Sequence, residues 1–210
     1  MLLLILSLIL INQYDFTIAR LKYSGGGDWY CDQTSLPNLL KAINGRTTIR
    51  AAPKEVVVEL TDPNIFKYPY LYMTGHGEVK FSEEEIKILR RFLTNGGFLH
   101  ADDCYGMDSS FRREMKKVFP DSPLIELPFD YPIYHSFYDF SEGLSKIHEH
   151  DNKPAQGFGI FYQNRLVVFY SYESDLGCGW EDADVHNDPP EKREAALRMG
   201  INIVIYYLTH

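Results

Sequence analysis

The stretch that decides the fold is residues 70–106, YLYMTGHGEVKFSEEEIKILRRFLTNGGFLHADDCYG. Short apolar runs at residues 70–73 and 98–101 predict two buried strands. Between them, Ser82 and Glu85 form a capping box that predicts the start of a helix, and an Asn-Gly-Gly sequence predicts its end. A strand, a helix and a second strand in this order indicate a βαβ unit, in which the two strands are parallel.

The same alternation of strands and helices continues on both sides of this unit. Residues 128–158 interrupt it, because they are rich in Pro, His, Tyr and Asp and show no periodic pattern. The alternation predicts an α/β fold, a three-layer sandwich on a mostly parallel, flavodoxin-like sheet, and we expect a single domain over residues 13–210. The other expected elements are strands at residues 14–23, 56–60, 124–127 and 165–172 and helices that begin at Ser35, Asp108 and Pro190.

The composition excludes several classes of protein. The chain of 210 residues has 29 acidic and 21 basic side chains, which gives a formal net charge of −8. A field of that sign repels phosphate backbones, so we expect no nucleic-acid partner. Three cysteines are too few for a disulfide-built scaffold or for the repeated cysteine pairs of structural zinc sites.

Residues 2–11, LLLILSLILI, form an apolar run at the N-terminus. A helix needs about 20 residues to span a bilayer, and this run is shorter. Its length is typical of the apolar region of a secretory signal, although no basic residue precedes it. We therefore expect residues 1–12 to be a signal peptide or its remnant, and the protein to be exported, periplasmic or envelope-associated, with membrane contact only through this segment. A buried first strand is the alternative.

Glycine-rich and acidic segments follow four of the predicted strands. They are GGGDWY at 25–30, TGHGE at 74–78, DDCYG at 102–106 and ESDLGCGWED at 173–182. Right-handed crossovers place all such loops at the carboxyl edge of a parallel sheet, where ligands of α/β proteins bind. The residues expected to bind a ligand there are Gly25, Gly26, Asp28, Trp29, His76, Asp102, Asp103, Glu173, Trp180 and Glu181.

Aromatic residues stand beside acids in these loops, which suggests the kind of ligand. Trp29, Tyr30, Tyr105 and Trp180 could stack on a sugar ring while neighbouring carboxylates accept its hydrogen bonds. We therefore expect a small polar ligand, with a carbohydrate as one candidate, held by stacking on the two tryptophans and by hydrogen bonds with His76 and Asp103. The alternative is that the aromatic rings only pack the loops together.

Catalysis is a competing interpretation, and the sequence leaves open whether the protein is an enzyme. Cys104 lies between a strand and a helix, as the nucleophile of a hydrolase or an amidotransferase-like enzyme does, and His186 with Asp188 could supply a base and its orienting carboxylate. The acids beside Cys104 would raise its pKa and weaken it as a nucleophile. Paired carboxylates could instead perform glycoside hydrolysis. A third interpretation is an interaction module of an envelope assembly that uses residues 128–158.

A divalent metal ion is the one cofactor that the sequence suggests. His148 and His150 are two residues apart, so in an extended segment both could face one ion. No recognised zinc or EF-hand spacing accompanies them. A solvated polar loop is the alternative interpretation.

Four long segments carry a resemblance to a known family. They are residues 16–30, 68–120, 146–161 and 171–210, which include TGHGEVKFSEEE, GGFLHADDCYG and SYESDLGCGWED. Through them the chain is similar to an uncharacterised bacterial family known as domain of unknown function 4159. The resemblance covers nearly the whole chain after Tyr14. It implies export or membrane association and a fold like that of class I glutamine amidotransferase-like and trehalose-utilisation-protein-like domains.

The same resemblance implies no activity, but it bears on the cysteines. It implies that Cys104 and Cys178 stand where relatives often carry Asn and Asp, so that Cys104 is not a nucleophile of the family. It also implies that the shared residues are those of the four loops after the strands.

Overall fold

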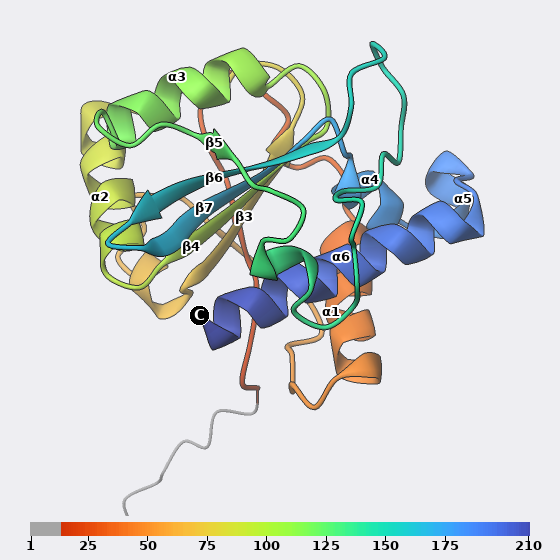
Figure 1. Ribbon diagram of the computed structural model, residues 1–210. Coiled ribbons are helices and arrows are strands. Elements are labelled where there is room, and N and C mark those ends of the chain that lie inside the picture. Colours follow the sequence, from red (N-terminus) through yellow and green to blue (C-terminus); the bar gives the residue numbers. More distant parts are fainter. Residues whose placement is uncertain (1–13) are drawn as a thin grey trace, which may run out of the picture.

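A computed structural model describes residues 14–210 as one α/β unit (Figure 1). The expected signal peptide at 1–12 lies outside the described residues. In chain order the elements are β1 (Ala19–Leu21), α1 (Ser35–Arg46), β2 (Val56–Val58), η1 (Ile65–Lys67), β3 (Tyr70–Gly75), α2 (Glu83–Thr94), β4 (Phe98–Asp103), α3 (Asp108–Val118), β5 (Ile125–Glu126), η2 (Pro132–Tyr134), β6 (Gln156–Tyr162), β7 (Arg165–Tyr172), α4 (Leu176–Trp180), α5 (Ala183–His186) and α6 (Pro190–Thr209).

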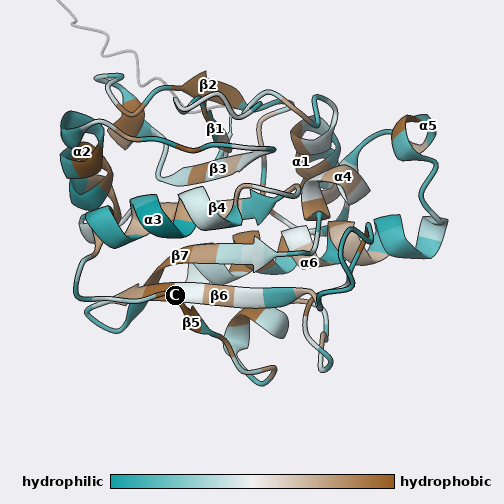
Figure 2. Cartoon of the chain, turned by 90° about the horizontal axis from the view of Figure 1, so that it is seen from above, coloured by the Kyte–Doolittle hydropathy of each residue, from teal (hydrophilic) through white to brown (hydrophobic). Residues whose placement is uncertain are grey.

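The sheet has seven strands in the order β2-β1-β3-β4-β7-β6-β5, which Figure 2 shows from one edge to the other. The first five strands in this order are parallel, and β6 and β5 join at one edge in antiparallel pairing. The parallel part has the flavodoxin-like order, in which the chain reverses direction across the sheet between β1 and β3. The predicted α/β fold and mostly parallel, flavodoxin-like sheet are therefore confirmed.

Helices cover both faces of the sheet and enclose two cores (Figure 1). Helices α2 and α3 cover one face, where residues such as Leu89 and Phe111 are buried. Helices α1, α4 and α6 cover the other, with Leu39 and Trp180 among the buried side chains. The predicted capping box is present, because Ser82 accepts from the Glu85 N–H and Glu85 accepts from the Ser82 N–H.

One strand was not predicted from the sequence. Residues 128–158 were expected to be irregular, yet β6 begins at Gln156 and forms a hairpin with β7. Gln163 and Asn164 make the two-residue turn, and both have left-handed backbones, with φ of 49° and 64°. Such a turn joins two antiparallel strands closely. The glycines of β6 obscured the strand, because they lower its apolar periodicity.

Three of the expected strands are shorter than their sequence patterns, and the one expected at 56–60 is Val56–Val58. The strand expected over residues 14–23 is regular only at Ala19–Leu21, and the one expected at 124–127 is Ile125–Glu126. Asp108 lies in the first turn of α3 and makes no side-chain cap there. Within residues 14–210, no helix is both long and apolar enough to cross a bilayer.

Candidate functional site

Four loops meet at the carboxyl edge of the parallel strands. The loop after β1 pairs with the loop after β3, where the Gly27 N–H donates to the Glu78 carbonyl at 3.0 Å. The Asp28 carboxylate accepts from the His76 backbone N–H and lies 3.0 Å from Nδ1 of the same histidine. The loop after β4 meets the segment after β7 through its acids and thiols. The edge is therefore a single polar region built from four separate parts of the chain.

A buried arginine fixes the loop after β1. Arg20 is 3% exposed and forms an ion pair with Glu55 at 3.5 Å. Its guanidinium also donates to the carbonyls of Cys31 and Asp32, at 2.8 and 3.0 Å, and to that of Trp29 at 3.4 Å. Because one buried guanidinium holds three carbonyls, it fixes the backbone of this loop.

Asp102 organises the junction between β4, β7 and α4. Its carboxylate accepts hydrogen bonds from the Gly177 N–H at 2.6 Å, from the Leu176 N–H at 3.3 Å and from the Ser171 hydroxyl. Burial raises the pKa of Asp102 to about 7, although these donors act in the opposite direction. All of its bonds go to the protein itself, so Asp102 positions the site and is not free to bind a ligand.

Several residues that the sequence assigned to a ligand have structural roles. Trp180 is 0% exposed and its indole N–H donates to the Ala196 carbonyl, which corrects the stacking role expected for it. Glu181 is 5% exposed and accepts from the Thr34 N–H at 2.8 Å. Trp29 is only half-buried and packs on the core under α2 and α3. The two large rings are therefore parts of the packing between the loops and the sheet.

The two glycines predicted to fit around a ligand differ in their surroundings. Gly25 has φ of 120°, and a Cβ placed there would come within 2.6 Å of the Glu78 carbonyl oxygen. This glycine is needed because the backbone after β3 packs against it. Gly26 has φ of 97° and nothing within 4 Å of such a Cβ. Of the two, only Gly26 leaves open space.

Three histidines and two aspartates gather beside α4. The His150 Nε2 lies 2.6 Å from an oxygen of Asp175, and the His148 Nε2 lies 3.0 Å from Asp188. His148, His150 and Asp175 each offer an atom within 4.8 Å of the others, so they could hold a metal ion. The His186 ring packs edge-on against His148, with ring centres 4.9 Å apart. The two residues chosen as metal ligands from their spacing thus face a common aspartate.

Asp175 is the most constrained member of this group. It is 1% exposed, and its backbone is left-handed, with φ of 56°. Within the described residues, its Oδ1 has no hydrogen-bond partner. Burial and the nearby Asp102 and Asp103 raise the pKa of Asp175 to about 8, and burial lowers the pKa of His150. A strained, buried and incompletely satisfied acid of this kind is typical of functional sites.

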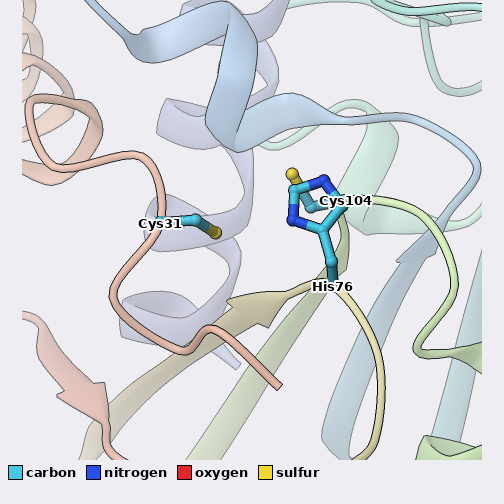
Figure 3. Close-up of side chains that lie close together, drawn as sticks. All are labelled: Cys31, His76 and Cys104. Atoms are coloured by element: carbon cyan, nitrogen blue, oxygen red, sulfur yellow. The ribbon is translucent and has the colours of Figure 1, made fainter. Parts of the chain in front are cut away.

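The thiol of Cys104 lies among other ligands, away from the expected catalytic partners. Its Sγ lies 3.4 Å from that of Cys178, and it forms a cluster with Cys31 and His76, whose side chains point toward one another (Figure 3). The contact with Cys178 and burial raise the pKa of Cys104. The hydrogen bond with Cys31 raises the pKa of His76 to about 9, against the effect of burial. His186 instead packs on His148, so the expected Cys104–His186 pair does not form.

An open pocket lies between the loop after β4 and residues 151–173. Its volume is about 260 Å³. Asp103 and Glu173 line it and are buried, and burial raises the pKa of Asp103 to about 6. Tyr105 is 44% exposed and stacks its ring on His150, with ring centres 4.4 Å apart. The pocket is lined by Asp103, Tyr105, Gly106, Asp108, Ser109, Asp151, Lys153, Tyr172 and Glu173.

Some residues of the site carried no usable signal in the sequence. Cys31, in the loop after β1, and Cys178, in α4, are far from Cys104 in the sequence, and no spacing links them. Lys153 lies in the region predicted to be irregular, where no pattern singles it out. In the structure it forms an ion pair with Asp151 at 2.5 Å. Tyr105 was named from the sequence as one of four aromatic residues in the loops, but nothing distinguished it from the other three. Its positive φ of 93° is visible only in the structure.

Comparison with known proteins identifies a family for the chain. The family model described as Domain of unknown function (DUF4159) matches residues 17–208, and the chain therefore belongs to this family. No curated protein matches the sequence. The expected family is confirmed, and it carries no assigned activity.

Proposed function

We propose that this member of the DUF4159 family binds a small polar ligand in the pocket between Tyr105 and Glu173. The observation that carries the proposal is the open pocket of about 260 Å³ at the carboxyl edge, lined by acids, one lysine and an exposed tyrosine. In α/β sheets of this kind, ligands bind at that edge.

The polar lining of the pocket suits a ligand with several hydroxyl groups. Glu173 is held by Lys146 at 2.9 Å, so one of its oxygens is fixed. The Lys153 ammonium lies 3.9 Å from the other oxygen of Glu173 and can donate, and Asp103 can accept. Tyr105 presents an exposed aromatic ring at the mouth. Acceptors beside an aromatic face are the pattern by which proteins recognise a sugar ring, so a carbohydrate is the ligand class we favour.

Saturation-transfer NMR with a panel of neutral mono- and disaccharides tests this proposal. We expect transfer to at least one sugar for the native protein and its loss for Tyr105→Ala and Glu173→Gln. Tyr30→Ala is the matched control, because Tyr30 is 57% exposed on the neighbouring loop and outside the pocket. The absence of transfer to every sugar in the panel, or equal transfer in Tyr105→Ala, would overturn the carbohydrate proposal.

A hydrolytic activity is the second candidate, and one pair of residues favours it. His150 and Asp175 form an imidazole–carboxylate pair at 2.6 Å beside the same pocket. In such a pair the imidazole can act as a general base that takes a proton from water, while the aspartate orients the ring. Assays with nitrophenyl glycosides and esters test it. We expect turnover that His150→Gln abolishes, whereas turnover that survives in His150→Gln would exclude this base.

Two broader proposals rest on the sequence and the sheet. We propose that the domain has the class I glutamine amidotransferase-like fold, which the flavodoxin-like strand order supports. We also propose that the protein is exported, which the apolar run at residues 2–11 supports. Fractionation of the source cells with an antibody against the protein tests export, and a purely cytosolic signal would contradict it.

A further inference from the structure

All three cysteines of the chain meet at one place, although they are far apart in the sequence. Cys31 follows β1, Cys104 follows β4, and Cys178 lies in α4 after β7. Cys31, His76 and Cys104 each offer an atom within 4.8 Å of the others. Asp32, Cys104 and Cys178 form a second such set, and Cys104 belongs to both. Figure 3 shows the first set, with side chains that come from three loops and point inward.

The distances in this cluster are close to those around a transition-metal ion. Tetrahedral zinc, with Zn–S of about 2.3 Å and Zn–N of about 2.0 Å, separates its ligand atoms by roughly 3.5–3.8 Å. The Cys104 and Cys178 sulfurs are 3.4 Å apart. One Asp32 oxygen lies 3.8 Å from the Cys104 sulfur, and the other lies 3.7 Å from the Cys178 sulfur. Because the Cys104 sulfur belongs to both sets, rotation of the Cys178 side chain toward Cys31 and His76 would place three sulfurs and the imidazole around one ion.

Neighbouring residues hold the candidate ligands of the cluster in place. Asp28 holds the His76 ring at 3.0 Å, as outer carboxylates orient metal-bound histidines. Arg20 fixes the backbone of Cys31 and Asp32 through their carbonyls. Cys104 is 2% exposed and Cys178 is 4% exposed, so water has little access to the sulfurs. These partners restrain the ligand-bearing loop whether or not an ion is bound.

We propose that Cys31, His76, Cys104 and Cys178 bind one transition-metal ion, and that this ion is zinc. Three sulfurs and one imidazole are the ligands of a closed zinc site with four protein donors. Binding releases the thiol protons to solvent, because the thiolate is the form that ligates. The ion links the loops after β1, β3 and β4 to α4 and closes the carboxyl edge. This site is separate from the sugar pocket, which none of these four residues lines.

Cobalt titration of the reduced full chain tests the proposal, because Co²⁺ bound by thiolates absorbs in the near ultraviolet. We expect saturation at one equivalent, visible bands of tetrahedral cobalt, and displacement by Zn²⁺. Cys31→Ser should lower the thiolate band by about one third, since one of three thiolates is lost. It should also weaken binding by more than the roughly 10–100-fold that loss of an outer partner costs. Cys31 is only half-buried, so this variant avoids the core.

Two controls separate this site from its neighbours. The double variant His148→Gln/His150→Gln removes the other candidate metal ligands and should leave the thiolate band unchanged. If that variant removes the band, or if reduced protein shows no thiolate band with Co²⁺, the proposal is overturned. Thiol counting under denaturing conditions without reductant should find three thiols in zinc-loaded protein after chelation. One thiol would indicate a Cys104–Cys178 disulfide and would also overturn it.

Discussion

Glu114 on α3 and Asp175 at the carboxyl edge are both buried carboxylates, but their surroundings differ. Glu114 is 0% exposed and forms ion pairs with Lys117 at 2.8 Å and Arg113 at 2.9 Å. It also accepts a hydrogen bond from the Phe81 N–H at 3.2 Å. Burial raises its pKa, but the two cations outweigh this effect, and the pKa of Glu114 is lowered. Within residues 14–210, Asp175 is paired with His148 and His150 and with no lysine or arginine, and its pKa is raised to about 8.

The difference separates an acid that stabilises the fold from one that we propose to be functional. The charge of Glu114 is compensated, so it joins α3 to the segment before α2 and stays ionised. Asp175 sits with His150, in a left-handed backbone, with one oxygen unsatisfied within the described residues. Proteins retain uncompensated groups of this kind mostly where a ligand, a proton or a metal ion uses them. The α3 face therefore carries a compensated acid that stabilises the fold, whereas the carboxyl edge carries the acid that supports the proposed function.

The largest expected effect is on the compensated acid. Glu114→Gln removes the charge that Lys117 and Arg113 share and weakens the acceptor for the Phe81 N–H. We expect a loss of about 3 kcal/mol in the free energy of unfolding, at the low end for broken buried pairs because both cations are half-exposed. Urea unfolding at neutral pH measures it. A loss below about 0.5 kcal/mol would show that the pair does not stabilise the fold.

A smaller loss is expected at Asp102, which is at the carboxyl edge but fully bonded. In Asp102→Asn the side-chain amide would point N–H groups at backbone donors such as the Gly177 N–H. We expect a cost of about 2 kcal/mol, measured by the same unfolding experiment. Asp108→Asn is the matched control, because Asp108 is partly exposed and its ion pair with Arg112 should contribute under about 1 kcal/mol. Equal effects of the two substitutions would remove Asp102 from its organising role.

The smallest effect, and one of opposite sign, is expected at Asp175. A raised pKa means that the folded protein holds a proton on Asp175 that the unfolded chain loses at lower pH. This contribution is complete below pH 3.8 and is lost as the pH rises through about 8. The lowered pKa of His150 opposes it below about 6.5, the ordinary value for histidine, so the net loss of stability falls between pH 6.5 and 8.

Asp175→Asn should therefore flatten the pH dependence of stability. At pH 8 we expect the variant to equal the native protein or exceed it by up to about 1 kcal/mol. Urea midpoints at pH 6, 7 and 8 for both proteins measure the difference between their slopes. A parallel decline in the two proteins would mean that another group, such as His76 with its raised pKa, accounts for the whole effect.

The sequence predicted the fold well where local patterns agree with the tertiary structure. The capping box, the Asn-Gly-Gly sequence and the two apolar runs identified α2 and its flanking strands. Parallel topology then placed the loops after the strands at one edge. Strand β6 was missed because Gly157 and Gly159 break its pattern; side chains there would collide with Tyr134 and Leu166.

The site was less predictable, because its chemistry depends on burial and on distant contacts. His148 and His150 could be paired from their spacing of two residues. The burial of Trp180 could not be foreseen, since a tryptophan in a polar loop can face either solvent or core. The contact of Cys104 with Cys178 joins residues 74 apart, and no pattern in the chain indicates it. Only the folded sheet brings these loops together.

The most direct test of the difference between the two acids is a carboxyl-carbon NMR titration that follows Glu114 and Asp175 in one sample. We expect a midpoint for Asp175 near pH 8 and a midpoint for Glu114 below 4.5. Asp175→Asn identifies the signal with the high midpoint. If both carboxyl groups titrate below 4.5, the acid at the carboxyl edge is compensated after all, and the division of the molecule into a structural and a functional region is wrong.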